Sequence, residues 1–199
     1  MAEYAETIQR LIDEFGKLPG IGARTAERLA FHVLKSEHED AMDLARAIRD
    51  VKTKIHPCAV CHNLTESETC GICSNPRRDR SVICVVEQPK DLLAIEATGA
   101  YDGVYHVLMG RIAPLEGAEP EDLTLDALEQ RVRAGGVEEL ILATNPTVAG
   151  DGTALHIASR LEPLGVRITR LARGLPSGGQ IEYANQSILT DAITERRQV

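Results

Sequence analysis

Cys58-Ala59-Val60-Cys61 and Cys70-Gly71-Ile72-Cys73 are two CxxC pairs that contain four of the five cysteines in this chain of 199 residues. The loop around them is rich in turn-forming and polar residues, so it cannot build a core of its own. Two such pairs at this spacing are typical of a tetrahedral Zn²⁺ site, to which each pair supplies two thiolates. The sequence therefore predicts a structural zinc site whose ligands are Cys58, Cys61, Cys70 and Cys73.

Other roles for paired cysteines fit less well. A disulfide framework needs an oxidising compartment, and Met1–Ala5 shows neither a basic nor an apolar leader, so we expect a cytoplasmic protein with reduced thiols. A redox CxxC usually occurs singly, and a catalytic zinc keeps an open coordination position that four thiolates do not leave. His56 and His62 flank the ligands and remain alternatives to one of them. Cys84, inside an apolar run, is expected to be a buried thiol.

Composition and charge limit the partners that this chain can have. Apolar residues make up 43% of the sequence, but no apolar run is long enough to span a membrane, so no membrane partner is expected. The formal net charge of −8 disfavours nucleic acid by itself. The acidity is uneven, however, because residues 1–80 contain 12 Lys and Arg against 13 Asp and Glu, whereas residues 81–199 contain 10 against 17. The first part can therefore present a local basic face.

The segment before the cysteines predicts two helices joined by a glycine-containing turn. Apolar side chains recur at helical spacing over residues 4–16 and 23–34, and Leu18-Pro19-Gly20-Ile21-Gly22 lies between them. This arrangement resembles the helix-hairpin-helix motif that binds the DNA backbone. Gly20 and Gly22 let the turn approach a phosphate closely, and the N-terminus of the second helix favours an anion.

Two arginines extend this predicted phosphate site. Arg24 and Arg28 are four residues apart, so they lie on one face of the second helix and can flank the same backbone. Such contacts neutralise phosphates without reading bases. The competing interpretation is an ordinary helical bundle with solvated arginines, although a plain bundle turn does not need the second glycine. A third helix, over residues 40–54, is expected to be a packing partner and spacer.

From residue 81 onward the pattern changes to short apolar runs that alternate with helical segments. The runs predict strands at residues 81–86, 104–108, 140–144 and 166–171, with helices at residues 89–98, 124–134 and 152–164. Alternation of this kind predicts a parallel α/β sheet, in which ligands gather at the carboxyl ends of the strands. Glu87 follows the first strand, and Asp151 follows the third after a short loop.

This sheet resembles the Toprim fold of topoisomerases, primases and small nucleases, where a Glu and an Asp-x-Asp bind Mg²⁺ for phosphoryl transfer. At the Asp-x-Asp positions the chain has Asn145 and Thr147, whose neutral oxygens attract Mg²⁺ far less than carboxylates do. Glu87 and Asp151 remain as ligands of a weak site at most. A metal-dependent nuclease therefore stays an alternative function, and so does a zinc-stapled interaction scaffold with no DNA role.

The order of these three regions resembles the RecR family of bacterial recombination mediators. The resemblance covers nearly the whole chain and includes Leu18–Gly22, the zinc spacing, Val85–Glu87, Ala143–Thr147 and Leu175–Gly179. We therefore predict an α/β fold with an all-α N-terminal part. Its expected domains are a helix-hairpin-helix domain over residues 1–54, a four-cysteine zinc finger over 55–80, a Toprim domain over 81–175 and a C-terminal segment over 176–199.

The resemblance also implies a function. Members of this family have no enzymatic activity of their own, form dimers and ring-like tetramers that encircle DNA, and act with RecO and RecF to load RecA on gapped DNA. It implies that Arg24 and Arg28 contact DNA and that the acidic cleft around Glu87, with Asp151, contacts RecO. Where the family usually has acidic residues this chain has Ala149 and Asn185, which puts a metal or nucleotide role of the C-terminal segment in doubt.

Overall fold

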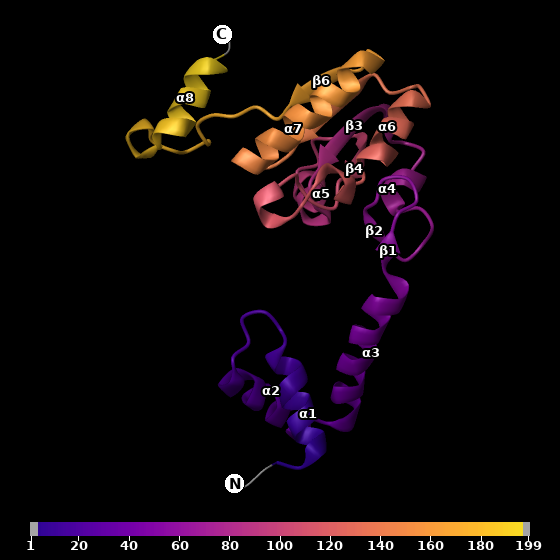
Figure 1. Ribbon diagram of the computed structural model, residues 1–199, viewed down its shortest axis with the longest axis vertical. Helices are drawn as coiled ribbons and strands as arrows, with labels where there is room; N and C mark the ends of the chain where they lie inside the picture. The colour runs from indigo at the N-terminus through magenta and orange to yellow at the C-terminus, as the bar shows by residue number, and fades with distance from the viewer. Residues whose placement is uncertain (1–3, 197–199) are drawn as a thin grey trace. The chain divides into compact units, whose positions relative to one another are not determined.

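The computed structural model describes residues 4–196 and divides into two compact units, Met1–Ile55 and His56–Val199 (Figure 1). The first and last three residues lie outside the described part. Two predictions fall partly on those residues: that the chain has no N-terminal leader, and where the first domain begins and the last domain ends. Among residues 4–196 we find no helix that is both long enough and apolar enough to cross a membrane.

The N-terminal unit contains the two predicted helices and the turn between them. Its helices are α1 (Glu6–Gly16), α2 (Ala23–Lys35) and α3 (His38–Lys54). Ala26 and Ala30 of α2 are buried, and side chains this small let α1 pack closely on α2. The ring of Tyr4 also packs edge-on against Phe31, with ring centroids 5.3 Å apart. The hydroxyl of Tyr4 donates a hydrogen bond to Glu27, which adds a polar contact to the pair.

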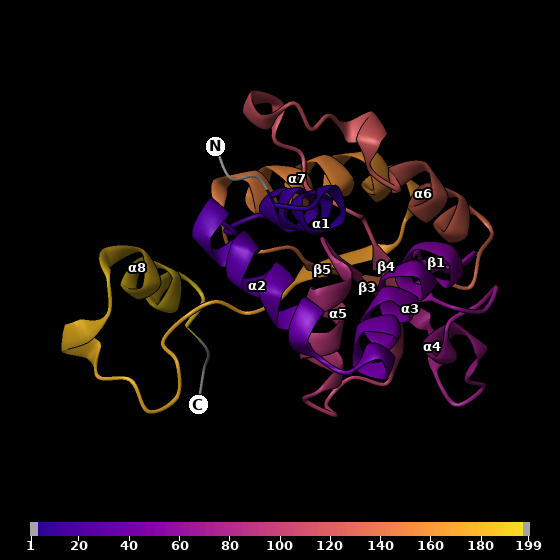
Figure 2. The same ribbon diagram turned by 90° about the horizontal axis from the view of Figure 1, so that it is seen from below.

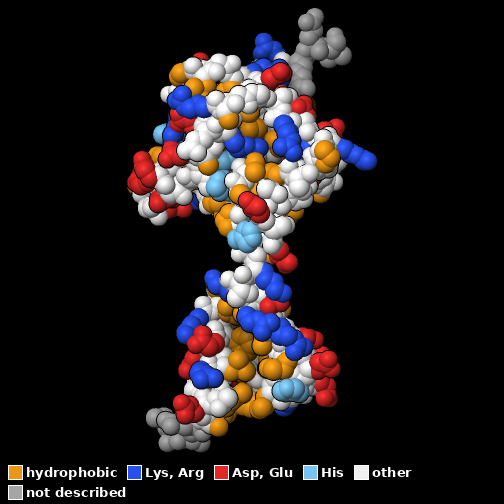
Figure 3. All heavy atoms as spheres, turned by 90° about the vertical axis from the view of Figure 1, so that its right-hand side faces the viewer, with side chains coloured by type: hydrophobic (Ala, Val, Ile, Leu, Met, Phe, Trp, Pro, Cys, Tyr) orange, Lys and Arg blue, Asp and Glu red, His pale blue; other side chains and the backbone are white. Residues whose placement is uncertain are grey.

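Helix α3 differs from the sequence prediction. Its larger apolar residues share one side, but none of its side chains is buried, and Leu44, Ile48 and Val51 are exposed to 45%, 58% and 61%. Figure 3 shows apolar side chains gathered on the surface of this unit. Within the N-terminal unit α3 is therefore not the packing partner that its pattern predicted. Amphipathic spacing identifies an apolar face, but it does not say what covers that face.

The second unit is built on a four-stranded sheet in the order β4-β3-β5-β6, and all three neighbouring pairs are parallel, as predicted. The strands are β3 (Asp79–Val86), β4 (Gly103–Val107), β5 (Glu139–Ala143) and β6 (Arg167–Arg170). The edge strand β6 is only half-buried, unlike the continuous burial that apolar runs predict, because it has a neighbouring strand on one side only.

Helices cover both faces of this sheet, with α5 on one face and α6 and α7 on the other (Figure 2). These helices are α5 (Pro89–Glu96), α6 (Leu125–Arg133) and α7 (Val148–Leu161). Along β3 the side chains alternate between the two faces, so that Ile83 packs with α6 and α7 and Cys84 with α5. Cys84 is buried as expected, and burial raises the pKa of its thiol to about 12.

Helix α7 begins at Val148, four residues earlier than the pattern predicts. The side-chain oxygen of Thr147 caps it by accepting a hydrogen bond from the backbone N of Gly150 at 3.0 Å. Gly150 and Gly152 are poor helix formers and conceal this first turn in the sequence. Asp151 therefore lies on the first turn of a helix and not in the loop after β5.

Short elements complete the second unit. The zinc-finger region contains β1 (His56–Pro57), β2 (Leu64–Thr65) and α4 (Gly71–Ser74). Single 3₁₀ turns are η1 (Pro114–Glu116), η2 (Pro120–Asp122), η3 (Glu162–Leu164) and η4 (Ile181–Tyr183). The last helix, α8 (Gln186–Thr194), begins at a cap in which the side chain of Asn185 accepts a hydrogen bond from the backbone N of Ile188 at 2.9 Å.

Candidate functional site

The four predicted zinc ligands lie together in the second unit. All four cysteines are buried free thiols, and their Sγ atoms lie within 4.8 Å of one another. A tetrahedral Zn²⁺ with Zn–S bonds of about 2.3 Å places its sulfurs about 3.8 Å apart. The Sγ atoms of Cys61 and Cys70 are 3.5 Å apart, close to that spacing. The donor set fits a structural zinc with four sulfur ligands.

Short backbone elements produce this geometry. Strands β1 and β2 pair antiparallel. The backbone N of Cys58 donates to the carbonyl of Asn63 at 2.7 Å, which closes the first knuckle, the turn that contains Cys58 and Cys61. His62 adopts a left-handed conformation with φ of 62° and turns the chain after Cys61. Cys70 is the N-cap of α4, and its backbone N donates to the Sγ of Cys58 at 3.2 Å. This bond joins the first knuckle to the second, the turn that contains Cys70 and Cys73.

The electrostatics of the four thiols favour a bound cation. Burial opposes ionisation of Cys58, but amide donors from Cys70, Cys61 and Val60 outweigh it and lower the pKa of Cys58 to about 6. The pKa of Cys61 is raised, chiefly by its hydrogen bond with Cys73 and then by burial. Thiolates this close repel one another, so all four ionise together only when a metal supplies positive charge.

The predicted phosphate-binding turn joins α1 to α2 in the N-terminal unit. Gly20 has φ of +79°, a conformation that favours glycine. Gly22 is the N-cap of α2 with an ordinary φ of −87°, and a Cβ added there would meet open space. No side chain among the described residues caps α2, so its first N–H groups lack a side-chain acceptor. Arg24 and Arg28 are both exposed on this helix, and their contact with DNA stays a prediction.

Glu87, the acidic residue predicted at the end of β3, is enclosed. It is 4% exposed, and its two carboxylate oxygens accept hydrogen bonds from the backbone N and the side-chain Nδ2 of Asn145, both at 2.8 Å. A Cβ added at Gly150 would lie 2.8 Å from Oε1 of Glu87, so the carboxylate sits against the first turn of α7. Glu87 is therefore an internal anion at a helix N-terminus. Its predicted contact with a partner stays a prediction, and its side chain is covered in this structure.

Asp151 has different partners. It forms ion pairs with Arg170, at 2.7 Å, and with Arg173. Hydrogen bonds from Arg173, and then from Arg170, lower the pKa of Asp151 to about 2. The backbone N of Arg173 donates to Oε2 of Glu195 at 3.0 Å, so these contacts connect α7 with the end of α8. The role of Asp151 in binding a partner also stays a prediction.

The structure does not assemble a carboxylate site for Mg²⁺ from Glu87 and Asp151. Over residues 4–196 the four cysteines are the only group of three or more His, Cys, Asp and Glu placed to hold a metal ion. The oxygens of Glu87 accept from Asn145, and those of Asp151 accept from arginines. Each carboxylate thus already has donors from the protein, which a metal would have to displace.

Sequence reasoning missed the cations around these sites. Arg170 and Arg173 gave no periodic signal, because each is one of several charged residues in a solvated segment. Arg131 of α6, in contrast, has a periodic signal in the sequence that could have identified it. It continues the three-residue spacing of the buried Leu125 and Leu128, which indicates a charged side chain at the margin of an apolar face.

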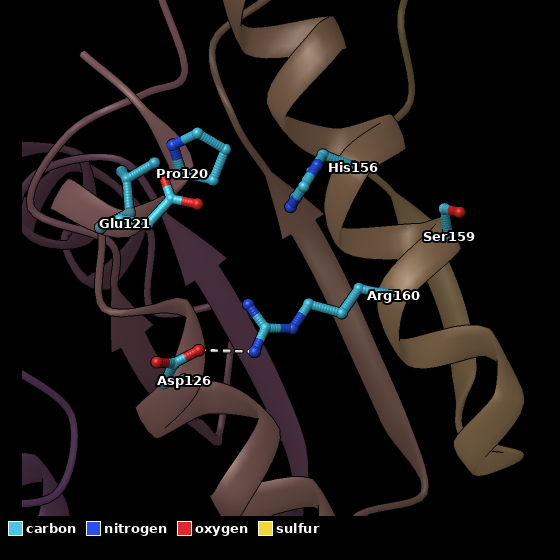
Figure 4. Close-up of a pocket in the computed structure, with 7 residues that line it drawn as sticks. Pro120, Glu121, Asp126, His156, Ser159 and Arg160 are labelled. Carbon is cyan, nitrogen blue, oxygen red and sulfur yellow. Dashed lines mark hydrogen bonds and ion pairs between the residues drawn. The ribbon is translucent and has the colours of Figure 1, made fainter.

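A shallow cavity of about 530 Å³ lies beside α6 and α7 (Figure 4). Glu121, Asp126, His156 and Arg160 are among its lining residues. The guanidinium of Arg160 donates to Asp126 at 2.5 Å and to Glu129 at 2.6 Å, so its charge is balanced within the protein. None of the residues predicted to be functional from the sequence lines this cavity.

Comparison with known proteins matches each of these regions. Family models described as the RecR helix-hairpin-helix, the RecR zinc finger domain with four cysteines and the Toprim domain match residues 8–52, 55–75 and 81–172. Proteins named Recombination protein RecR from Rhodopirellula baltica and Rubrobacter xylanophilus are 53% and 54% identical over 199 residues, covering 100% of both chains in each case. A third protein named Recombination protein RecR, from Acidothermus cellulolyticus, is 52% identical over 196 residues, which cover 98% of both chains.

These comparisons confirm the predicted family, the fold class and the four-cysteine zinc finger. Relatives that match over the whole length are named as recombination proteins, in agreement with the predicted role in DNA recombination and repair. The chain belongs to the RecR family of recombination proteins.

Proposed function

We propose that this chain is a non-enzymatic recombination mediator that binds the DNA backbone through the turn between α1 and α2. It works in the cytoplasm, where the bacterial chromosome lies, as a dimer or a ring-like tetramer. With RecO and RecF it loads RecA on gapped DNA, and the region around Glu87 and Asp151 binds RecO.

The observation that supports DNA binding most directly is the open N-terminus of α2. Its cap residue is Gly22, no described side chain occupies its first N–H groups, and Arg24 and Arg28 are exposed on the same helix. Backbone N–H groups, a helix dipole and two guanidinium groups together favour a phosphate. They carry no information about base sequence, which suits a protein that must act on gaps of any sequence.

The exposed face of α3 supports the oligomeric part of the proposal. Leu44, Ile48 and Val51 follow one another at helical spacing, and all three are exposed. An apolar stripe of this kind marks an interaction surface. A ring also multiplies the few phosphate contacts that a single turn makes, so a protein with a net charge of −8 can still hold DNA. Light scattering should show a smaller assembly for Ile48→Asp than for the unaltered protein.

Charge reversal at α2 tests DNA binding. The double variant Arg24→Glu, Arg28→Glu should bind gapped DNA at least about tenfold more weakly, with a salt dependence reduced by roughly one phosphate contact per arginine. The matched control is Arg111→Glu, Arg133→Glu, which makes the same charge change at two arginines that pair with acidic residues in the second unit. Unchanged, salt-insensitive affinity of the double variant at α2, measured by fluorescence anisotropy with RecO present, would favour the scaffold without a DNA role.

A substitution at Gly22 separates phosphate approach from folding. G22S places a capping side chain at the start of α2, so thermal stability should stay the same or rise. Its hydroxyl would occupy the N–H groups offered to the phosphate, so DNA affinity should fall several-fold. If affinity is kept while stability rises, the helix N-terminus is not the phosphate site.

The nuclease alternative needs its own experiment. Purified protein incubated with Mg²⁺ or Mn²⁺ and with nicked, gapped and single-stranded DNA should leave every substrate intact. Cleavage that Glu87→Gln abolishes would overturn the non-enzymatic proposal.

A further inference from the structure

Arg131 lies between the zinc finger and the sheet. It lies on α6, is half-buried, and its Nη1 donates to the carbonyl of Tyr105 in β4 at 2.6 Å. Together with Cys73 and Arg80 it lines a small cavity of about 160 Å³. Over residues 4–196 no ion pair joins Arg131 to an aspartate or glutamate, whereas its neighbour Arg133 pairs with Glu129.

A half-buried guanidinium without a carboxylate is costly unless another negative group lies near it. Burial lowers the pKa of Arg131, and the opposing negative charges come first from the thiols of Cys73, Cys61 and Cys58. Because Cys73 lines the same small cavity as Arg131, a charged set of zinc ligands lies beside this guanidinium.

A zinc finger that holds its metal adds negative charge beside these arginines. One Zn²⁺ with four thiolates carries two excess negative charges, which need nearby donors and cations when the site is buried. The backbone N of Cys70 donates to the Sγ of Cys58, and Nη2 of Arg80 donates to the carbonyl of Cys73 at 3.0 Å. Arg131 and the more exposed Arg80 are thus two cations at the margin of the ligand set.

The same margin is where the finger contacts the sheet. The backbone N of Val107, at the end of β4, donates to the carbonyl of Cys61 at 2.8 Å. The ring of His62 packs edge-on against His106 of β4, with ring centroids 5.3 Å apart. Strand β4 is an edge strand, so the finger supplies contacts that a further strand would otherwise provide.

We propose that Arg131 is the counter-ion of the zinc thiolate centre and that it links metal binding to the β4 edge of the sheet. It is a positioning residue, since its hydrogen bond to the carbonyl of Tyr105 fixes a guanidinium that lines the same cavity as Cys73. Metal binding then stabilises the finger and the adjacent strand as one unit.

Three variants test the charge. Arg131→Gln keeps an amide donor but loses the cation, Arg131→Lys keeps the cation, and Arg133→Gln is the control on the same helix. Zinc release to a chromogenic chelator should be roughly 10–100-fold faster in Arg131→Gln and within about threefold of the unaltered rate in Arg131→Lys. Arg133→Gln should release zinc at the unaltered rate. Release from Arg131→Gln at the unaltered rate, or equally fast release from Arg131→Lys, would overturn the proposal.

The link to the sheet is tested without any substitution. Hydrogen exchange of the Val107 amide and of the β6 amides is followed in the unaltered protein before and after chelation of zinc. We expect the protection factor of the Val107 amide to fall at least about tenfold, while those of the β6 amides change little, because the finger contacts β4 and not β6. Equal changes in the two strands, or no change at Val107, would contradict the link.

Discussion

The zinc finger and the carboxyl edge of the sheet both present metal-binding residue types at suggestive positions, yet only the finger brings them together. Its four sulfurs lie within 4.8 Å of one another. At the sheet edge, Glu87 is held by Asn145, and Asp151 is held by Arg170 and Arg173. Ligands that a tight turn places side by side remain ligands. Carboxylates far apart in the sequence depend on which donors the fold brings to them.

Loss of a zinc ligand should lower the thermal stability of the protein most. Cys70→Ser removes a ligand at the point where the two knuckles meet, so we expect less than one zinc per chain. Because a structural zinc contributes on the order of 10 kcal/mol, the thermal midpoint should fall by more than about 10 °C. Metal analysis and thermal denaturation measure both quantities.

Cys84→Ala is the matched control for that variant. Cys84 is buried in the sheet and is not a ligand, so this change should keep one zinc per chain and cost only about 1 kcal/mol. If Cys70→Ser retained its zinc and its thermal midpoint, the contrast between the two regions would not hold.

The sign of the stability change in Glu87→Gln distinguishes a carboxylate held by hydrogen bonds from one in a metal site. In a metal site built from repelling carboxylates, neutralising one of them stabilises the metal-free protein. Here the carboxylate accepts two hydrogen bonds from Asn145 beside a helix N-terminus, so the variant should lose about 1–3 kcal/mol of unfolding free energy. Urea denaturation without divalent metals measures this, with the exposed Glu121→Gln as control. A stabilised variant would support a metal site.

Asp151→Asn should have the smallest effect. The side chain is over a third exposed, so losing its arginine pairs should cost about 0.5–1 kcal/mol at neutral pH. Because folding lowers the pKa of Asp151 from 3.8 to about 2, its stabilisation is complete above about pH 4 and is lost as the pH falls toward 2. The difference between variant and unaltered protein should shrink over that range. A difference that is constant with pH would show that the ion pairs contribute nothing.

The features that depend on near neighbours in the chain could be predicted from the amino-acid pattern. Two CxxC pairs, a glycine turn between amphipathic helices, and apolar runs alternating with helices predicted the zinc ligands, the hairpin of α1 and α2, and a parallel sheet. Each of these patterns reflects contacts within a few residues of the chain. The physical causes are turn geometry, helical periodicity and strand alternation.

The three-dimensional fold alone sets which distant groups meet. It places Asn145 against Glu87, 58 residues away, and Arg173 against Asp151, and it brings Arg131 to the same small cavity as Cys73. It also leaves the apolar face of α3 uncovered within its unit. A charged or apolar side chain has the same local pattern whatever it later contacts, and its partner depends on which strands become neighbours and which helix covers them.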